Sequence, residues 1–211
     1  MTARPTVAAS ISTNQSIAPE IPPQVPRRMS ESGRSFGCTG LRVLGWRMEG
    51  NLPDEAKLVL IVAPHTSNWD FVVGFLCYLA LDVGATWFGK HTIFRWPFGA
   101  VFRHFGGIPI YRDSQSAGSV VDLYSDEFAK RERMVLAIAP EGTRRKVTEW
   151  KSGFYRIAVR AGASIVPVIL DYSRKRIVLD APIYPTGEWE TDIVRIKGRF
   201  KAEQARHPEQ F

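Results

Sequence analysis

The sequence predicts a single α/β domain, a sandwich in which helices flank a largely parallel central sheet. Nearly continuous apolar runs occur at 57–63, 134–139 and 165–170, and such runs are typical of strands that are covered on both faces. Segments with helical spacing separate these runs, and this alternation predicts a parallel sheet between helices. The 211 residues suffice for one domain with its own core and make two domains the poorer prediction.

The N-terminal segment differs in composition from the rest. Residues 1–34 are rich in Pro, Ser and Thr, and the densest stretch reads PEIPPQVPRR. A segment of this kind offers little apolar surface for burial, which predicts a disordered tail or tether before a folded domain at 35–211. We therefore expect removal of residues 1–34 to leave function nearly unchanged.

The first half of the predicted domain alternates in type. A short strand is expected at 41–49, followed by the apolar strand at 57–63. Residues 71–81 remain apolar beyond the length of a strand, which predicts a buried helix. Residues 119–131 carry apolar side chains at helical spacing and end in basic ones, as the C-termini of helices prefer. The next strand, at 134–139, ends before a proline.

The C-terminal part continues this alternation. Residues 154–161 predict a helix that Gly162 ends. The strand at 165–170 is expected to pair with 177–179 across a short turn. Apolar residues at 193, 196 and 200 indicate a closing helix.

The charge and the cysteines limit the class of protein. Lys and Arg number 28 against 21 Asp and Glu, so the formal net charge is +7 and favours an anionic partner: a phosphate-bearing substrate, nucleic acid or acidic lipid. Cys38 and Cys77 lie far apart without metal-ligand spacing, so we expect neither disulfides nor a zinc site, and a reducing cytosol fits. The chain has neither a secretory signal pattern nor an apolar stretch near the roughly 20 residues of a membrane span.

One candidate site follows the strand at 57–63, in the stretch APHTSNWDF. Histidine titrates near neutral pH and can take a proton from an alcohol, while a carboxylate beside it can hold the ring tautomer and stabilise the imidazolium. A loop leading into a helix could bring His65 and Asp70 together, with Asp70 near the helix N-terminus. The alternative is that Asp70 only caps the helix and that His65 is a buried, hydrogen-bonded ring. The spacing alone leaves both interpretations open.

A second candidate loop, PEGTR at 140–144, follows the strand at 134–139. Gly142 permits a tight turn close to a ligand, and the planar guanidinium of Arg144 suits a phosphate. Glu141 can accept from a hydroxyl or pair with a cation. The alternative is a solvated turn with basic neighbours. Both loops follow strand ends, where ligands bind in open α/β sheets.

Together the two loops resemble the glycerolipid acyltransferase family, which includes the bacterial lysophosphatidic acid acyltransferases. That family has an Asn-His-x-x-x-x-Asp block and, about seventy residues later, Phe-Pro-Glu-Gly-Thr-Arg. Here the blocks read PHTSNWD at 64–70 and APEGTR at 139–144. The stretch GIPIYR at 107–112 and the pair KSG and VPV, at 151–153 and 166–168, are similar to further family blocks in the same order.

The resemblance, which covers about residues 40–205, implies an O-acyltransferase. Acyl-CoA or acyl carrier protein would donate a fatty acyl group to the free hydroxyl of lysophosphatidic acid, giving phosphatidic acid, without a cofactor or metal. His65 would be the general base and Asp70 would hold its ring. Because a thiolate is a good leaving group, no covalent enzyme intermediate is needed.

The resemblance also implies the contacts to the acceptor. These are Arg144 and Arg112 for the phosphate, Glu141, Gly142 and Thr143 for the glycerol pocket, and Lys90, which matches a lysine before the second block. The chain departs from the family pattern at Pro64, Pro109, Tyr111 and Ala139. None of these positions is the base, so the departures concern the acceptor, for which another lysolipid or an amino-acid lipid is the alternative.

Residues 87–105 raise the question of a membrane surface. They combine seven aromatic residues with Lys90, Arg95 and Arg103. Aromatic rings beside cations suit the headgroup region of a bilayer, whereas the alternative is that the rings fill the core. A lipid substrate and the positive charge favour peripheral contact with the inner face of the cytoplasmic membrane, so we expect a cytoplasmic protein.

A non-catalytic protein that binds lipid or nucleic acid is the remaining alternative. The basic stretch at 195–201 is the feature that would suggest nucleic acid. A solvated helix face explains this stretch better, and the sequence contains no recognised nucleic-acid module. We therefore expect no nucleic-acid partner.

Overall fold

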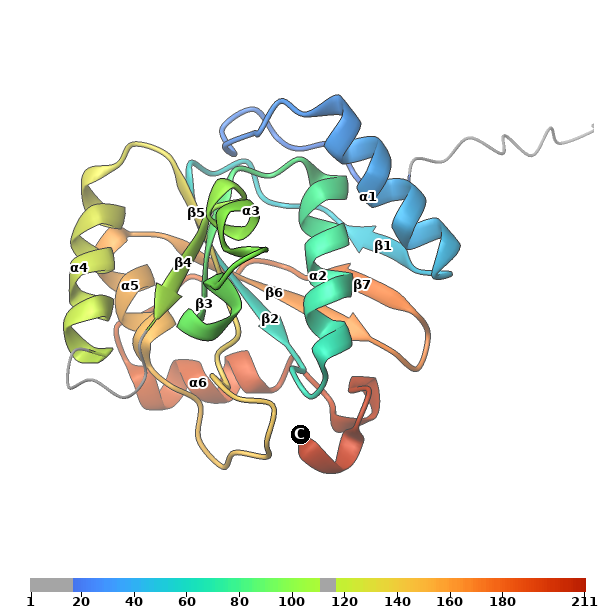
Figure 1. The fold of residues 1–211 in the computed structure, drawn as a ribbon. Coiled ribbons are helices and arrows are strands. Elements are labelled where there is room, and N and C mark those ends of the chain that lie inside the picture. Colours follow the sequence, from blue (N-terminus) through green and yellow to red (C-terminus); the bar gives the residue numbers. More distant parts are fainter. Residues whose placement is uncertain (1–16, 111–116) are drawn as a thin grey trace, which may run out of the picture.

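The computed structural model describes residues 17–110 and 117–211, and within them a seven-stranded sheet lies between helices (Figure 1). The elements are α1 (Glu31–Val43), β1 (Arg47–Gly50), β2 (Lys57–Ala63), α2 (Asn68–Leu81), β3 (Ala85–Lys90), α3 (Gly99–His104), β4 (Gly107–Ile110), α4 (Ala117–Lys130), β5 (Met134–Ile138), α5 (Gly153–Ala161), β6 (Ser164–Asp171), β7 (Arg176–Leu179) and α6 (Trp189–Lys197). Short 3₁₀ helices occupy His91–Phe94, Ala202–Gln204 and Pro208–Gln210. The predicted α/β class is confirmed.

The order of the strands brings the carboxyl ends of neighbouring parallel strands to the same side of the sheet. The order is β1-β7-β6-β2-β5-β3-β4, and the last five strands are parallel to one another. Strand β7 is antiparallel to β6, as predicted, and β1 runs parallel to β7. The carboxyl ends of five neighbouring strands therefore lie along the same edge.

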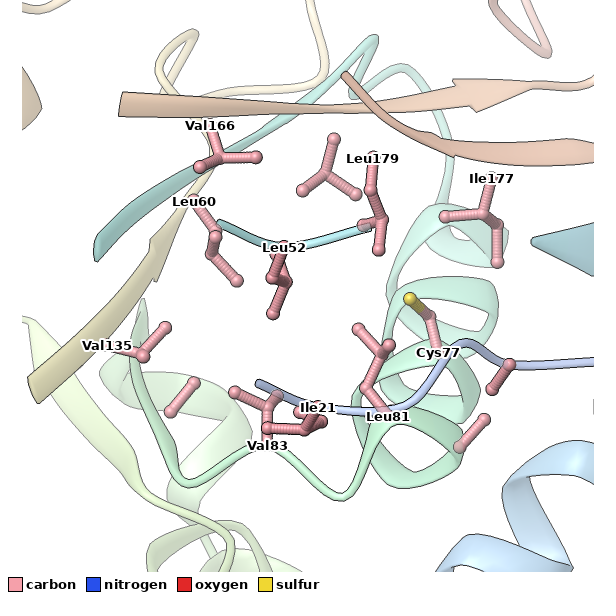
Figure 2. Close-up of a cluster of buried hydrophobic side chains, with 14 of the residues drawn as sticks. Ile21, Leu52, Leu60, Cys77, Leu81, Val83, Val135, Val166, Ile177 and Leu179 are labelled. Atoms are coloured by element: carbon pink, nitrogen blue, oxygen red, sulfur yellow. The ribbon is translucent and has the colours of Figure 1, made fainter. Parts of the chain in front are cut away.

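Two hydrophobic cores explain why the strands are apolar throughout. Alternate residues of a strand point to opposite faces. In β2, Leu58 and Leu60 pack in the cluster under α1 and α2, whereas Val59 and Ile61 pack in the cluster under α4, α5 and α6. Figure 2 shows the first cluster, in which Leu60, Val135 and Val166 line the sheet. Burial on both faces fixes the position of β2, from which the loop at 64–67 starts.

Helices α1 and α2 pack unusually close together. A Cβ atom on Gly37 would lie 2.4 Å from the backbone nitrogen of Ala80, so only glycine fits at this point of α1. The start of α2 is fixed by Ser67, whose side chain accepts from the helix backbone in a capping box with Asp70. The predicted helix at 71–81 is thus confirmed and begins three residues earlier.

The predicted boundary of the domain is wrong for residues 17–34. Helix α1 begins at Glu31, and Ile21 is only 3% exposed in the first core, near Leu81 and Val83 (Figure 2). The carbonyl of Pro26 also accepts a hydrogen bond of 2.7 Å from the backbone of Gly84. Composition misled the prediction because a few apolar residues between prolines can fill a core without forming a regular element.

Deletion of residues 1–34 would affect the folded part of the protein. Residues 1–16 lie outside the described residues, but removing 1–34 would also remove buried side chains and the first turn of α1. We therefore now expect this deletion to destabilise the fold, and with it to lower function. The predicted strand at 41–49 is also shorter than expected, because Leu41–Val43 end α1 and only Arg47–Gly50 pair.

Candidate active site

Three loops of the candidate site start from neighbouring strands. The register aligns Ile61 of β2 with Ile138 of β5 and Ala63 of β2 with Ile169 of β6. Strand β2 therefore extends two residues beyond the end of β5, and β6 extends two residues beyond the end of β2. The residues that follow these strands meet, because Glu141 accepts the backbone N–H of His65 and Tyr172 donates to Asp70. The segments that follow β2, β5 and β6 are, in this order, the loop at 64–67, the loop at 139–152 and the turn that begins with Tyr172.

His65 and Asp70 face each other, as the sequence predicted. The ring atom Nδ1 of His65 lies 3.4 Å from Oδ2 of Asp70, and the side chains are 22% and 1% exposed. The same Oδ2 atom accepts the backbone N–H groups of Thr66 (2.6 Å) and Ser67 (2.7 Å) at the start of α2. Asp70 is therefore both a helix cap and the neighbour of the imidazole, so capping α2 does not exclude the predicted pairing with His65.

The environment of Asp70 keeps it ionised. Burial disfavours its charge, but hydrogen bonds with His65, Tyr172 and Ser67 outweigh burial and lower the pKa of Asp70 below its ordinary value. An ionised carboxylate at Nδ1 favours a ring whose proton is on Nδ1. The other ring nitrogen, Nε2, is then the atom that can accept a proton from a substrate.

Glu141 links the His65 loop and the PEGTR loop in a way that the sequence did not predict. Its Oε1 atom accepts the backbone N–H of His65 at 2.9 Å, and the side chain is buried. Burial raises the pKa of Glu141, and its hydrogen bond with the His65 backbone partly offsets this effect. Glu141 also lines a small cavity of about 160 Å³. The first task of this carboxylate is therefore to hold the PEGTR loop against the His65 loop.

Exposure in the PEGTR loop increases along the chain, from the buried Pro140 to the exposed Arg144. Gly142 adopts φ +65°, in the left-handed region, which explains a glycine at this position. Arg144 is exposed, and the hydroxyl of Thr143 accepts the backbone N–H of Arg145 at 3.3 Å. The loop thus presents cationic side chains to solvent at the edge of the sheet where His65 lies.

The remaining predicted contacts have different outcomes. Lys90 is the last residue of β3, which is parallel to β5, and its side chain is exposed at the same edge of the sheet. Arg112 lies outside the described residues. Within residues 17–110 and 117–211, no group of three or more His, Cys, Asp or Glu side chains could hold a metal ion.

A C-terminal segment, residues 202–211, covers the loops (Figure 1). The backbone N–H of His207 donates to the hydroxyl of Thr66 at 3.2 Å. The side-chain amide nitrogen of Gln210 reaches the carbonyls of Arg144 (2.8 Å) and Thr66 (3.2 Å). Sequence reasoning missed this segment, because no local pattern indicates which loops a 3₁₀ turn will cover.

Tyr172 is the other residue that sequence reasoning missed. Its hydroxyl donates to Oδ1 of Asp70 at 2.6 Å, across 102 positions of the chain. The signal that could have found it is its place two residues after the strand predicted at 165–170, at the carboxyl end of the sheet where ligand sites form.

Comparison with known proteins identifies the family of this chain. A family model described as Acyltransferase matches residues 46–171, more than half of the chain. The chain belongs to the acyltransferase family. It is 26% identical over 166 residues to the 1-acyl-sn-glycerol-3-phosphate acyltransferase of Salmonella typhimurium and 26% identical over 167 residues to that of Escherichia coli. Each match covers 75% of this chain and 66% of the relative, slightly less than two thirds of its length.

A solved structure supports the fold of this acyltransferase-family chain. The 1-acyl-sn-glycerophosphate (LPA) acyltransferase PlsC from Thermotoga maritima superposes with a TM-score of 0.56 at 17% identity. The match covers 80% of this chain and 76% of that one. The mostly parallel sheet between helices is therefore shared with this protein.

Proposed function

We propose that this protein transfers a fatty acyl group from a thioester, acyl-CoA or acyl carrier protein, to the free hydroxyl of lysophosphatidic acid, giving phosphatidic acid. The observation that carries the proposal is the His65 imidazole held against the buried Asp70 carboxylate, at an edge that also presents Arg144. The names of the two bacterial relatives support the choice of acceptor.

The chemistry follows from the ring geometry. Nε2 of His65 takes the proton of the acceptor hydroxyl while that oxygen attacks the thioester carbonyl. Asp70 stabilises the imidazolium that forms. When the tetrahedral intermediate collapses, the C–S bond breaks, the ester C–O bond remains, and the thiolate leaves and recovers the proton from His65. No bond to the protein forms.

The acceptor phosphate is assigned to the exposed guanidinium of Arg144, which offers a planar pair of donors to an anion. Replacing Arg144 by alanine should lower kcat/KM for lysophosphatidic acid by about 10- to 100-fold, the range expected for a hydrogen bond to a charged group. Activity on an uncharged monoacylglycerol should change much less. Labelled acyl-CoA or acyl carrier protein and a panel of acceptors, including other lysolipids and amino-acid lipids, provide the measurement.

Arg145→Ala is the matched control, because Arg145 is also exposed and adjacent. Equal losses on charged and uncharged acceptors would show that Arg144 does not bind the phosphate. If the wild type prefers another lysolipid or an amino-acid lipid, that lipid is the acceptor and the assignment of lysophosphatidic acid is wrong. Lipid binding without any transfer would favour a non-catalytic protein.

Contact with a membrane surface is the second part of the proposal. The rings of residues 87–105 divide into two groups: Phe94 is buried and Phe102 packs against Phe71, whereas Trp96 and Phe98 are 93% and 62% exposed. No Asp or Glu occurs between positions 83 and 112. Exposed rings in a segment with only positive charges favour an anionic bilayer surface. No helix of residues 17–110 and 117–211 is both long and apolar enough to cross a bilayer.

Replacing both Trp96 and Phe98 by serine should weaken binding to vesicles of anionic phospholipid by about tenfold or more, given about 1.5–3 kcal/mol for burying one large apolar side chain. Sedimentation with vesicles measures this binding. Phe36→Ser, at an exposed ring on α1, is the control and should bind like wild type. Unchanged binding of the double variant would rule out these rings as the contact with lipid.

A further inference from the structure

We propose that Tyr172 is a positioning residue for acyl transfer, which fixes the Asp70 carboxylate so that His65 stays oriented toward the acceptor. The inference rests on the proposed function and adds to it a residue outside the family blocks. The family match ends at position 171, so Tyr172 is the first residue beyond it.

The two oxygens of Asp70 have separate sets of partners. Oδ2 receives the backbone N–H groups of Thr66 and Ser67 and lies 3.4 Å from the His65 ring. Oδ1 receives the hydroxyl of Tyr172 at 2.6 Å. A carboxylate held only through Oδ2 could still turn about its Cβ–Cγ bond, and a donor on Oδ1 opposes this rotation. Tyr172 therefore determines how well Oδ2 stays aligned with the imidazole.

Tyr172 is itself held from several directions. It directly follows β6, and its ring meets Trp46 edge to face with centroids 4.8 Å apart. Its backbone N–H donates to the carbonyl of Gln204 at 2.9 Å, and the guanidinium of Arg206 lies 6.0 Å from the centre of its ring. These contacts keep the hydroxyl from following a displaced carboxylate.

The hydroxyl is also suited to remain a donor. Burial, together with its hydrogen bond to Asp70, raises the pKa of Tyr172 above its ordinary value. The group therefore stays protonated throughout the range in which the imidazole can act as a base. A neutral donor at this place stabilises the ionised carboxylate without adding a second charge.

Tyr172→Phe removes only the hydroxyl and keeps the ring that packs on Trp46. We expect kcat to fall on the order of tenfold with KM nearly unchanged, because the hydrogen bond supports the proton transfer and does not touch the substrate. In an Asp70→Ala background, the same Tyr172→Phe change should have almost no further effect on kcat. Such non-additivity is the signature of a residue that acts through its neighbour.

Tyr155 and Tyr184 are matched controls, because both also donate to carboxylates in the part of the chain that the structure describes. Tyr155 donates to the buried Asp192 at 2.8 Å, and Tyr184 donates to Glu55 at 2.8 Å on the surface. Tyr155→Phe should lower the thermal midpoint while kcat stays at the wild-type level, and Tyr184→Phe should change neither. These variants separate loss of a hydroxyl–carboxylate bond in general from loss of this one.

The outcomes are distinct. Wild-type kcat in Tyr172→Phe, or the same factor of loss in the Asp70→Ala background, would overturn the positioning role. A loss confined to KM would do so too. If Asp70→Ala is unfolded, Asp70→Asn supplies the background, since its oxygen can still cap α2. The proposed function is tested separately, by transfer in the wild type. Absence of transfer there would contradict the proposed function, whereas the comparison of kcat between variants tests only the role of Tyr172.

Discussion

His65→Ala should lower kcat for acyl transfer by about 10²- to 10⁴-fold, the range that a positioned general base contributes. The fold should survive, because the link from this residue to Glu141 is made by its backbone N–H and not by its ring. Because the ring is only one of several partners of Asp70, we expect a slightly lowered thermal midpoint together with nearly complete loss of transfer. Single-turnover assays with labelled acyl donor measure the chemical step directly.

His104→Ala is the control for this experiment, since His104 is an exposed histidine on α3. It should retain wild-type kcat. Turnover close to wild type in His65→Ala would defeat the assignment of the base, and with it the mechanism built on Nε2. Loss of the thermal transition in His65→Ala would show that the ring has a structural task that its partial exposure does not indicate.

The buried strands of the sheet could be predicted, because burial on both faces is the usual cause of a short continuous apolar run. Strands β2, β5 and β6 are buried, so their sequences are apolar at consecutive positions and reveal a parallel sheet. Strands β3 and β4 were missed, because their residues are only partly buried and include glycine and proline. Residues 17–34 were misassigned because their high proline content suggested disorder, whereas composition does not show that Ile21 is buried in the core.

The two loops that carry the candidate site could be predicted from the sequence, but the contacts that connect them to each other and to Tyr172 could not. His65, Asp70 and the PEGTR loop lie in compact blocks whose spacing is visible in the chain. The bonds that connect these blocks are not visible, because Glu141 meets the His65 backbone across 76 positions and Tyr172 meets Asp70 across 102. Only the order of strands in the sheet brings such partners together, and that order was not predicted. Arg112 lies outside the described residues, so its contact with the acceptor stays a prediction.

Asp70→Asn should reduce kcat on the order of 10²- to 10⁴-fold, because the amide cannot hold the required ring tautomer or stabilise the imidazolium. It should also change how stability depends on pH. The folded-state pKa of Asp70 is lowered, so the ionised carboxylate contributes stability above the pKa it has in the unfolded chain, and this contribution disappears as pH falls through the folded-state pKa. The difference in unfolding free energy between wild type and Asp70→Asn should therefore shrink on acidification.

Urea unfolding from neutral pH into the acidic range tests the second expectation, and steady-state assays test the first. Asp126→Asn is the control, because Asp126 forms an exposed ion pair with Arg160 and should alter both quantities little. A constant difference across the pH range would mean that the partners of Asp70 do not favour its charged form. Because the same hydrogen bonds cap α2 and orient the imidazole, stability and catalysis should decline together as that carboxylate becomes protonated.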